Sequence, residues 1–419
     1  MRPIRTANVL AIGSELLTPD RIDTNSLYLT AQLNALGIIV THKCVVGDEM
    51  NDLQRAISQS LERADAVFVS GGLGPTADDL TREAAAACLG LALNEDPEIV
   101  EALHLRFAKR GAPMPENNRR QAMVPEGAVV LPNPRGSAPG LMMATGDQLV
   151  VLLPGPPREL EPMFEASVRE PLMARTVGER LRRRVLKIAG LPESRVDEIA
   201  APIYLPWATE ALPVQTTILA SPGLVELRLA AIGRDVSAVD AHLDRKIQLL
   251  AAAVGDNAFS DDGRSLERVI GDALRTRGLT LALAESCTGG MAAARITDVP
   301  GSSEYFRGGV VAYANEVKID VLGVPADLIA AHGAVSEPVA AAMAQGARTR
   351  LGVDIAAAVT GIAGPDGGTE TKPVGTVCFS VSGPGKNAAT VTRVVPGDRQ
   401  LIRQWAVIVM LDLVRRAVR

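Results

Sequence analysis

The stretch Asp65–Thr81, DAVFVSGGLGPTADDLT, decides the fold of the first part of the chain. It predicts a buried strand over Asp65–Ser70, because the run is short, apolar and rich in β-strand formers, and glycines end it. Upstream, the pattern predicts a strand at Val9–Ile12, a helix at Asn25–Leu36 and a strand at Ile38–Val46. This alternation predicts a parallel sheet covered on both faces, which binds ligands beyond the carboxyl ends of its strands.

The rest of the sequence predicts a small middle module and a second α/β domain. In the middle we expect a strand, a helix, a hairpin that turns at residues 221–223, and a second helix: Val185–Ala189, Glu193–Ala201, Gln215–Ile232 and Val236–Val254. Further on we expect, in order, a helix, three strands and a closing helix: Leu266–Arg277, Leu279–Ala284, Gly309–Tyr313, Ile355–Thr360 and Asp398–Arg416. A length of 419 residues suits about three domains. We therefore predict an α/β fold class, with two three-layer α/β domains, residues 1–172 and 256–419, joined by a small α+β module, residues 173–255.

Composition excludes several classes of protein. A net charge of −5 and only 3% aromatic residues argue against bulk nucleic-acid binding as the function, since phosphates attract basic surfaces and bases stack on aromatic rings. The four cysteines form no C-x-x-C pair, so neither a disulfide framework nor a zinc site is indicated. The first residues do not have the pattern of a signal peptide, and the longest late apolar stretch, Trp405–Leu411, is too short to span a bilayer. We expect a cytoplasmic protein without membrane contact.

The first candidate site follows the strand that ends at Ser70. The glycines Gly71, Gly72 and Gly74 let the backbone approach a ligand closely. Thr76 is placed to cap a helix, whose free N–H groups attract anions. Asp78 and Asp79 would repel phosphates unless a divalent cation lay between them, which predicts a magnesium-like metal. In the alternative interpretation, the two acids only complement the helix dipole. Two Pro/Gly loops, Asn133–Gly140 and Pro154–Glu159, are weaker candidates for the same ligand.

The second candidate site begins where Leu279–Ala284 meets Ser286. A hydroxyl at a strand-to-helix turn, near helix N–H groups, suits a nucleophile that faces a developing oxyanion. His332 is the only histidine of this domain, so a Ser-His-Asp triad is poorly supported, and Lys318 remains as the base, with its proton affinity lowered by burial. Cys287 is a rival nucleophile, although a small buried cysteine is more common.

Further groups extend this second site. Tyr313 stands at the end of the strand that precedes Lys318. Thr360 and Gly361 open a Gly-rich segment, residues 360–368, that could hold an anion or an amide oxygen.

Together, these motifs resemble, along nearly the whole chain, the competence/damage-inducible protein A (CinA) family. The run Gly71–Thr81, with Asn25 and the two Pro/Gly loops, is similar to the molybdopterin-binding-like domain of that family. The segments that carry Ser286, Tyr313 with Lys318, and Thr360 are similar to its nicotinamide mononucleotide amidohydrolase domain.

The resemblance implies two activities. The carboxyl-terminal domain would convert nicotinamide mononucleotide to nicotinate mononucleotide and ammonia without a cofactor. The amino-terminal domain would cleave ADP-ribose to AMP and ribose 5-phosphate with a divalent metal of the magnesium or cobalt type, held by Asp78 and Asp79. The residues implied to bind substrate in that domain are Gly71, Gly72, Gly74, Thr76, Asn133 and Ser137.

In the carboxyl-terminal domain, the resemblance makes Ser286 the nucleophile and Lys318 and Tyr313 the groups that handle protons. Ser303, Thr360 and Gly361 would support the substrate, and Arg399 would hold its phosphate, with Arg403 in reserve.

The resemblance also implies a KH-like middle module. Because residues 180–255 contain no G-x-x-G loop, RNA binding is not expected, and a spacer or dimerisation role is favoured. We expect a homodimer that acts on small nucleotides. The alternative is a nucleotide- or pterin-binding regulator linked to competence, in which the amino-terminal domain performs no chemistry.

Overall fold

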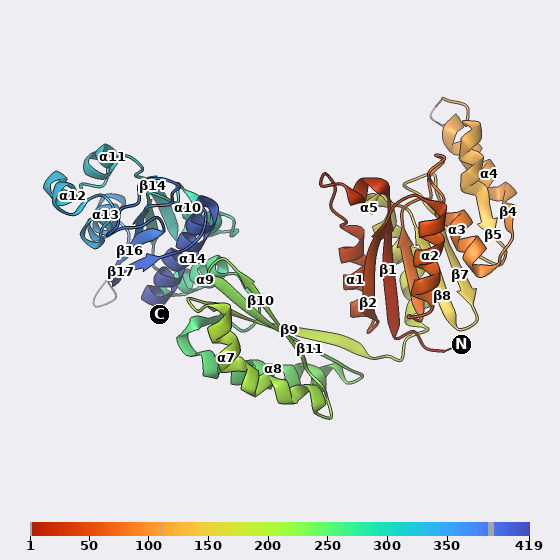
Figure 1. Cartoon of the computed structure of the whole chain (residues 1–419), viewed down its shortest axis with the longest axis horizontal. Coiled ribbons are helices and arrows are strands. Elements are labelled where there is room, and N and C mark those ends of the chain that lie inside the picture. The colour runs from red at the N-terminus through yellow and green to blue at the C-terminus, as the bar shows by residue number, and fades with distance from the viewer. Residues whose placement is uncertain (1, 110, 384–388) are drawn as a thin grey trace. The chain divides into compact units, whose positions relative to one another are not determined.

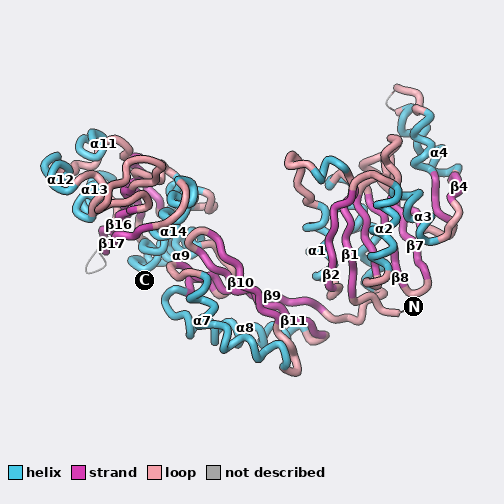
Figure 2. Tube along the Cα trace, in the orientation of Figure 1, coloured by secondary structure: helices cyan, strands magenta, loops and turns pink. Residues whose placement is uncertain are grey.

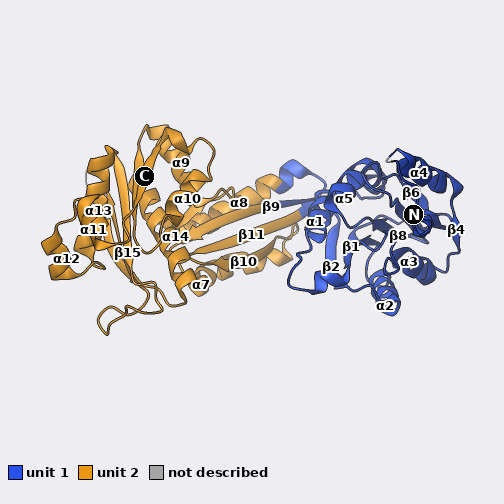
Figure 3. Ribbon diagram, turned by 90° about the horizontal axis from the view of Figure 1, so that it is seen from above, with its two compact units in different colours: residues 1–182, 232–239 blue, residues 183–231, 240–419 orange. Residues whose placement is uncertain are grey.

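The computed structural model describes residues 2–109, 111–383 and 389–419 (Figure 1). The chain divides into two compact units, residues 1–182 with 232–239 and residues 183–231 with 240–419 (Figure 3). The α/β fold class is confirmed. The predicted domain boundaries at residues 172 and 255 remain predictions, because most of the middle module belongs to the same compact unit as the carboxyl-terminal segment.

A mixed six-stranded sheet forms the first unit, in the order β2-β1-β3-β8-β7-β6. Its strands are β1 (Thr6–Ile12), β2 (Ile39–Val46), β3 (Ala66–Ser70), β6 (Val129–Leu131), β7 (Gly140–Thr145) and β8 (Gln148–Leu153). The first three and β8 are parallel, whereas β7 is antiparallel to both β8 and β6. The prediction of a parallel sheet is therefore wrong at this edge, because the two residues Gly146 and Asp147 that join β7 to β8 are too few for a crossover.

Helices cover both faces of this sheet. They are α1 (Asn25–Ala35), α2 (Met50–Leu61), α3 (Thr81–Leu89), α4 (Pro97–Ala108), α5 (Pro157–Met163) and α6 (Arg169–Met173), and a short ladder joins β4 (Leu93–Glu95) to β5 (Met123–Pro125). All five residues of β3 are buried. Phe68 packs with the α1 and α5 side, whereas Val67 and Val69 pack with the α2 and α3 side. The period of two along a strand thus makes β3 the centre of a three-layer unit.

The middle module places helices α7 (Glu193–Tyr204) and α8 (Val236–Val254) with a small sheet of order β10-β11-β9-β12 (Figure 2). Its strands are β9 (Arg180–Ala189), β10 (Gln215–Ser221), β11 (Leu224–Gly233) and β12 (Ala258–Ser260). The hairpin of β10 and β11 is confirmed, and Gly223 takes the positive φ of 75° that its tight turn requires.

The last sheet has the order β14-β13-β15-β16-β17. Its strands are β13 (Leu281–Glu285), β14 (Phe306–Val311), β15 (Ile355–Gly361), β16 (Thr376–Ser382) and β17 (Ala389–Val394). The first three are parallel, and β16 and β17 extend the sheet by antiparallel pairing.

Two groups of helices cover this last sheet. Helices α9 (Leu266–Arg277), α10 (Met291–Thr297) and α14 (Arg399–Val418) pack on one face, and α11 (Asn315–Asp320), α12 (Ala326–His332) and α13 (Glu337–Leu351) pack on the other. Among the described residues, no helix is long and apolar enough to cross a membrane.

Candidate functional site

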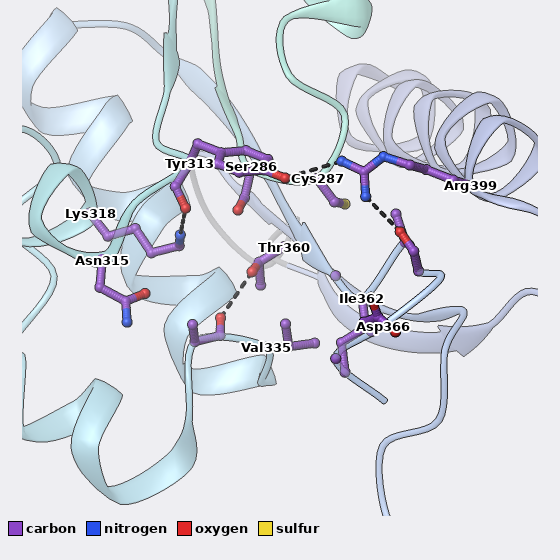
Figure 4. Close-up of a pocket in the computed structure, with 15 residues that line it drawn as sticks. Ser286, Cys287, Tyr313, Asn315, Lys318, Val335, Thr360, Ile362, Asp366 and Arg399 are labelled. Carbon is purple, nitrogen blue, oxygen red and sulfur yellow. Dashed lines mark hydrogen bonds between the residues drawn. The ribbon is translucent and has the colours of Figure 1, made fainter. Parts of the chain in front are cut away.

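A pocket of about 280 Å³ lies at the carboxyl ends of β13, β14 and β15 (Figure 4). Most of the residues predicted for the second candidate site line it: Ser286, Tyr313, Lys318, Thr360, Gly361 and Arg399. These residues are far apart in the chain, and they meet because parallel strands end at the same edge of a sheet. Asn315 also lines the pocket, and its place just after a strand end is the signal that could have identified it.

Ser286 stands on the turn between β13 and α10. Its backbone N–H donates to the carbonyl of Val359 on β15 at 3.0 Å, and its side chain enters the pocket (Figure 4). The preceding carboxylate, Glu285, is buried and accepts hydrogen bonds from the backbone N–H groups of Gly290, Ala292 and Ala293 at 2.8–3.1 Å. The expectation that these helix N–H groups would serve an oxyanion is therefore wrong, since Glu285 already occupies them.

Lys318 lies on the short helix α11, which follows β14, where the sequence predicted a polar loop. It is 1% exposed, and its Nζ donates to the carbonyl oxygens of Ala312 at 2.9 Å and Tyr313 at 3.0 Å. Burial lowers the pKa of Lys318, in the predicted direction. A neutral amine has two N–H bonds and one lone pair, so these two carbonyls leave the lone pair free to accept a proton.

Tyr313 and Arg399 are joined at the mouth of the pocket. The Arg399 Nη2 donates to the Tyr313 hydroxyl at 3.1 Å, and its Nη1 donates to the carbonyl of Gly364 at 2.7 Å (Figure 4). Tyr313 is 61% exposed, so this pair is open to a ligand from solvent. Thr360 is buried, and its hydroxyl donates to the carbonyl of Ala334, which also lines the pocket.

Cys287 and Arg403 are the predicted alternatives to Ser286 as nucleophile and to Arg399 as phosphate ligand. Burial raises the pKa of the Cys287 thiol to about 12, so the thiolate needed for attack is scarce at neutral pH. Arg403 donates to the carbonyls of Cys287 and Thr288 at 3.0 and 2.9 Å, and it is absent from the lining of the pocket. Of the two arginines, Arg399 is therefore the one that lines the pocket.

Ser303 is not brought to this pocket. It lies on the surface in the segment before β14, and the next residues pair with Leu281 at the start of β13. Because β13 and β14 are parallel, a residue that precedes β14 lies at the amino end of the sheet, opposite the pocket.

A second pocket, of about 340 Å³, lies in the first unit beyond β1, β3 and β8. It is lined by Gly71, Gly72 and Gly74, as predicted for a phosphate loop. Gly71 and Gly72 have φ values of 102° and 66°, and a Cβ on Gly71 would collide with the carbonyl of Ile12. Only glycine allows the chain to turn this closely around the end of β1.

Thr76 does not cap a helix. Helix α3 begins at Thr81 with Leu80 as its N-cap, and the Asp79 Oδ2 instead accepts hydrogen bonds from the backbone N–H and hydroxyl of Thr76 at 2.9 and 2.5 Å. The proline and the small residues between Gly74 and Asp79 thus form a side-chain-stabilised turn rather than a first helical turn. One oxygen of Asp79 is committed to this turn, and hydrogen bonding by the Thr76 side chain lowers the pKa of Asp78, so Thr76 influences both carboxylates.

Carboxylates converge on this second pocket from several strand ends. Besides Asp78 and Asp79, the lining contains Glu15, Asp48 and Glu159. Within the described part of the chain, no three acidic, histidine or cysteine side chains are close enough to form a complete metal site. The arrangement fits Mg²⁺, which takes one or two carboxylates and completes its shell with water and substrate phosphates. Glu15 and Asp48 follow β1 and β2, and the strand-end rule could have identified them.

The loop between β6 and β7 forms one wall of the second pocket. The Asn133 side chain holds the loop by accepting from the backbone N–H of Gly136 at 2.7 Å and donating to Glu159 at 2.8 Å. This places Ser137 in the lining. Asn133 is thus a support for the wall, and Ser137 faces the pocket, although both were predicted to bind substrate.

A buried cation lies behind the glycine loop. Arg82, on α3, is 0% exposed, and its Nη2 donates to the carbonyls of Leu73 and Gly74. Its Nε and Nη1 have no hydrogen-bond partner among the described residues. Burial lowers the pKa of Arg82 to about 10, so the guanidinium stays charged at neutral pH.

Comparison with known proteins agrees with this two-part arrangement. Residues 8–174 match the probable molybdopterin binding domain, and residues 263–418 match the CinA C-terminal domain. A protein of Symbiobacterium thermophilum named among the competence-damage inducible proteins is 48% identical, over 98% of this chain and 98% of its own length. A CinA-like protein of Solibacter usitatus is 45% identical over 98% of both chains. The crystal structure of the protein CinA from Thermoplasma acidophilum is 33% identical, covers 40% of this chain and 98% of that chain, and has a TM-score of 0.38.

Proposed function

Since the chain belongs to the CinA family, we propose that it is a bifunctional hydrolase of pyridine nucleotide salvage. The carboxyl-terminal pocket deamidates nicotinamide mononucleotide to nicotinate mononucleotide and ammonia. The pocket of the first unit cleaves ADP-ribose to AMP and ribose 5-phosphate with a divalent metal. The single observation that carries the proposal is the buried amine of Lys318 in one pocket with the Ser286 hydroxyl, since this is the combination that a serine-lysine hydrolase requires.

The proposed amide hydrolysis passes through an acyl-serine. As the Ser286 Oγ attacks the carboxamide carbon, its proton moves to the neutral Nζ of Lys318. The C–N bond then breaks, and the nitrogen leaves as ammonia after it takes this proton from Lys318. A water molecule hydrolyses the ester in the same way and returns Ser286 to its starting state. The carbonyls of Ala312 and Tyr313 hold the amine in place throughout.

Arg399 supplies recognition of the substrate phosphate. Its guanidinium uses two N–H groups on Gly364 and Tyr313 and has further donors for phosphate oxygens. The hydrogen bond to the Tyr313 hydroxyl supports the role of Tyr313 as a group that positions or protonates the substrate at the mouth of the pocket.

In the first unit, Asp78 and Asp79 would hold a divalent metal together with the pyrophosphate. The metal would supply charge neutralisation at the phosphoryl oxygens. The chain itself offers close approach of the backbone at Gly71–Gly74 and the buried positive charge of Arg82 behind that loop.

A second candidate function applies to this unit alone. The match of residues 8–174 to the probable molybdopterin binding domain favours a pocket that binds a pterin or a nucleotide and performs no chemistry. In that case the protein is a regulator as far as its first unit is concerned, and purified protein with Mg²⁺ or Co²⁺ will bind ADP-ribose but release no AMP.

Ammonia release from nicotinamide mononucleotide by the purified full chain tests the main proposal. The Ser286→Ala variant is the negative control, and Cys287→Ala is the matched control at the adjacent position. Absence of ammonia from the folded wild-type protein, or equal release by Ser286→Ala, refutes the amidohydrolase.

A further inference from the structure

The proposed acyl transfer requires a hydrogen-bond donor that the residues discussed so far do not supply. When the Ser286 Oγ attacks the carboxamide carbon, the π electrons of the C=O bond move to the oxygen, which becomes an oxyanion and is stabilised by N–H or O–H donors. The N–H groups at the start of α10 do not serve, because Glu285 accepts their hydrogen bonds at 2.8–3.1 Å. The donor therefore comes from another part of the pocket.

Other donors of the pocket are also in use. The Ser286 N–H donates to a carbonyl of β15 at 3.0 Å, and the Thr360 hydroxyl donates to the carbonyl of Ala334 at 2.9 Å. Lys318 directs two N–H groups to backbone carbonyls. Its third N–H forms only when it takes the serine proton, and this proton then passes to the leaving nitrogen. These groups are thus not available to the oxyanion from its formation to its collapse.

Asn315 carries a donor that is free. It is the first residue of the short helix α11, it is exposed, and it lines the pocket. Its side-chain amide makes no hydrogen bond within the described part of the chain (Figure 4). An amide has two N–H donors and an acceptor oxygen, and it does not titrate. This side chain is therefore available to a ligand in the pocket.

Helical geometry places the amide of Asn315 next to the base. Asn315 and Lys318 are three residues apart on α11, so their side chains leave the same face of the helix, with about 5–6 Å between their Cβ atoms. Figure 4 shows both side chains on the same side of the pocket. A carboxamide carries its nitrogen and its oxygen side by side on one carbon. When the nitrogen faces Lys318, which protonates it, the oxygen can face Asn315.

We infer that the Nδ2 of Asn315 donates a hydrogen bond to the oxyanion that forms when Ser286 attacks the amide. This inference rests on the proposed amidohydrolase function and adds a catalytic residue to it. As the tetrahedral intermediate collapses, the electrons return to the C=O bond, the C–N bond breaks, and the nitrogen leaves with the proton from Lys318. The hydrogen bond is strongest while the oxygen is charged, so it lowers the barrier more than it strengthens substrate binding.

The test compares Asn315→Ala with Asp320→Ala in the full chain, with nicotinamide mononucleotide as the substrate. Asp320 is the matched control, because it is exposed on the same helix and does not line the pocket. Loss of one oxyanion donor costs about 10²–10³-fold in kcat, so Asn315→Ala should lose this factor while KM changes less than about threefold. Asp320→Ala should behave like the wild type. An unchanged kcat, a loss confined to KM, or an equal loss in Asp320→Ala overturns the assignment.

Two further measurements separate a donor from a residue that only positions its neighbours. Because the amide does not titrate, Asn315→Ala should keep the pH profile of the wild type; activity that returns at higher pH would mean that Asn315 acts through the pKa of Lys318. Asn315→Asp keeps the shape of the side chain, but a carboxylate has no N–H and repels an oxyanion. It should lose at least as much activity as Asn315→Ala, and full activity in Asn315→Asp would overturn the donor role.

An activated ester distinguishes failure of this inference from failure of the proposed function. p-Nitrophenyl acetate acylates a serine through the same kind of oxyanion and carries no nucleotide. If the wild type releases no ammonia, but its Ser286-dependent release of p-nitrophenolate is at least about tenfold slower in Asn315→Ala, the amidohydrolase is refuted and the donor stands. If ammonia is released and Asn315→Ala matches the wild type with both substrates, the donor is refuted and the amidohydrolase stands. A wild type that acts on neither substrate refutes both.

Discussion

Replacing Lys318 with methionine removes the proposed base and keeps the length of the side chain. A general base contributes about 10²–10⁴-fold to a rate, so ammonia release should fall by that factor. The fold should survive, because the variant loses two hydrogen bonds, to Ala312 and Tyr313, each of which contributes about 1 kcal/mol. A large loss of activity with a small loss of stability is thus the expected result.

The pH dependence gives an independent check. The folded pKa of Lys318 lies below its ordinary value of 10.5, so between these two values the unfolded chain binds more protons than the folded chain. Stability therefore rises with pH across this window, by at most about 1.4 kcal/mol per pH unit, and Lys318→Met should lack this rise. Activity of the wild type should also rise with pH through the lowered pKa, because only the neutral amine accepts a proton.

Ammonia release and urea unfolding, each measured from pH 6 to 11, provide the assay. Lys318→Arg is the matched control, since arginine keeps the charge and the donors but does not deprotonate. It should be as inactive as Lys318→Met. If Lys318→Arg keeps more than about a tenth of the activity, or if Lys318→Met does, the base is another group.

Three further predictions concern the two pockets. Ser286→Ala should lower ammonia release at least about a thousandfold, whereas Cys287→Ala should keep most of it, because the thiol is protonated at neutral pH; the reverse pattern would make the thiol the nucleophile. Arg399→Met should raise KM for nicotinamide mononucleotide at least about tenfold with little change in kcat, while Arg403→Met should instead lower the free energy of unfolding by about 2 kcal/mol; steady-state kinetics and urea unfolding separate the two. Asp78→Asn should reduce metal-dependent cleavage of ADP-ribose by more than about a hundredfold, and excess chelator should abolish cleavage in the wild type; full activity in chelator would exclude a metal.

Much of the fold follows from local patterns in the sequence. Helices over Val236–Val254 and Leu266–Arg277 have the predicted bounds, because their apolar positions recur with the helical period. The strand Thr376–Ser382 could not be predicted in this way. All seven of its residues are buried, but serine, threonine and cysteine interrupt the apolar run, and only pairing with β15 and β17 makes these positions internal.

Site residues could be predicted from the sequence where a motif directly follows a strand. They could not be predicted where the order and direction of the strands determine which residues meet. Ser286 and Thr360 meet because both stand at carboxyl ends of parallel strands. Ser303 is closer to Ser286 in sequence than Thr360 is, but it precedes the strand β14 and therefore lies at the other end of the sheet. Distance along the sequence does not distinguish the two ends of a sheet. Nor could the sequence reveal that the Glu285 carboxylate accepts hydrogen bonds from the first N–H groups of α10, because this depends on the direction in which its buried side chain points.

Arg82 has a consequence for how the first unit can evolve and be engineered. A buried guanidinium with unpartnered N–H groups weakens the folded state, and an apolar side chain of similar volume in its place is often as stable or more so. Selection for thermal stability alone would therefore tend to remove Arg82, and selection for a bound phosphate would tend to keep it. Variants of this unit chosen only for heat resistance are expected to lose the positive charge behind the glycine loop, and thermostability screens should include a ligand-binding step.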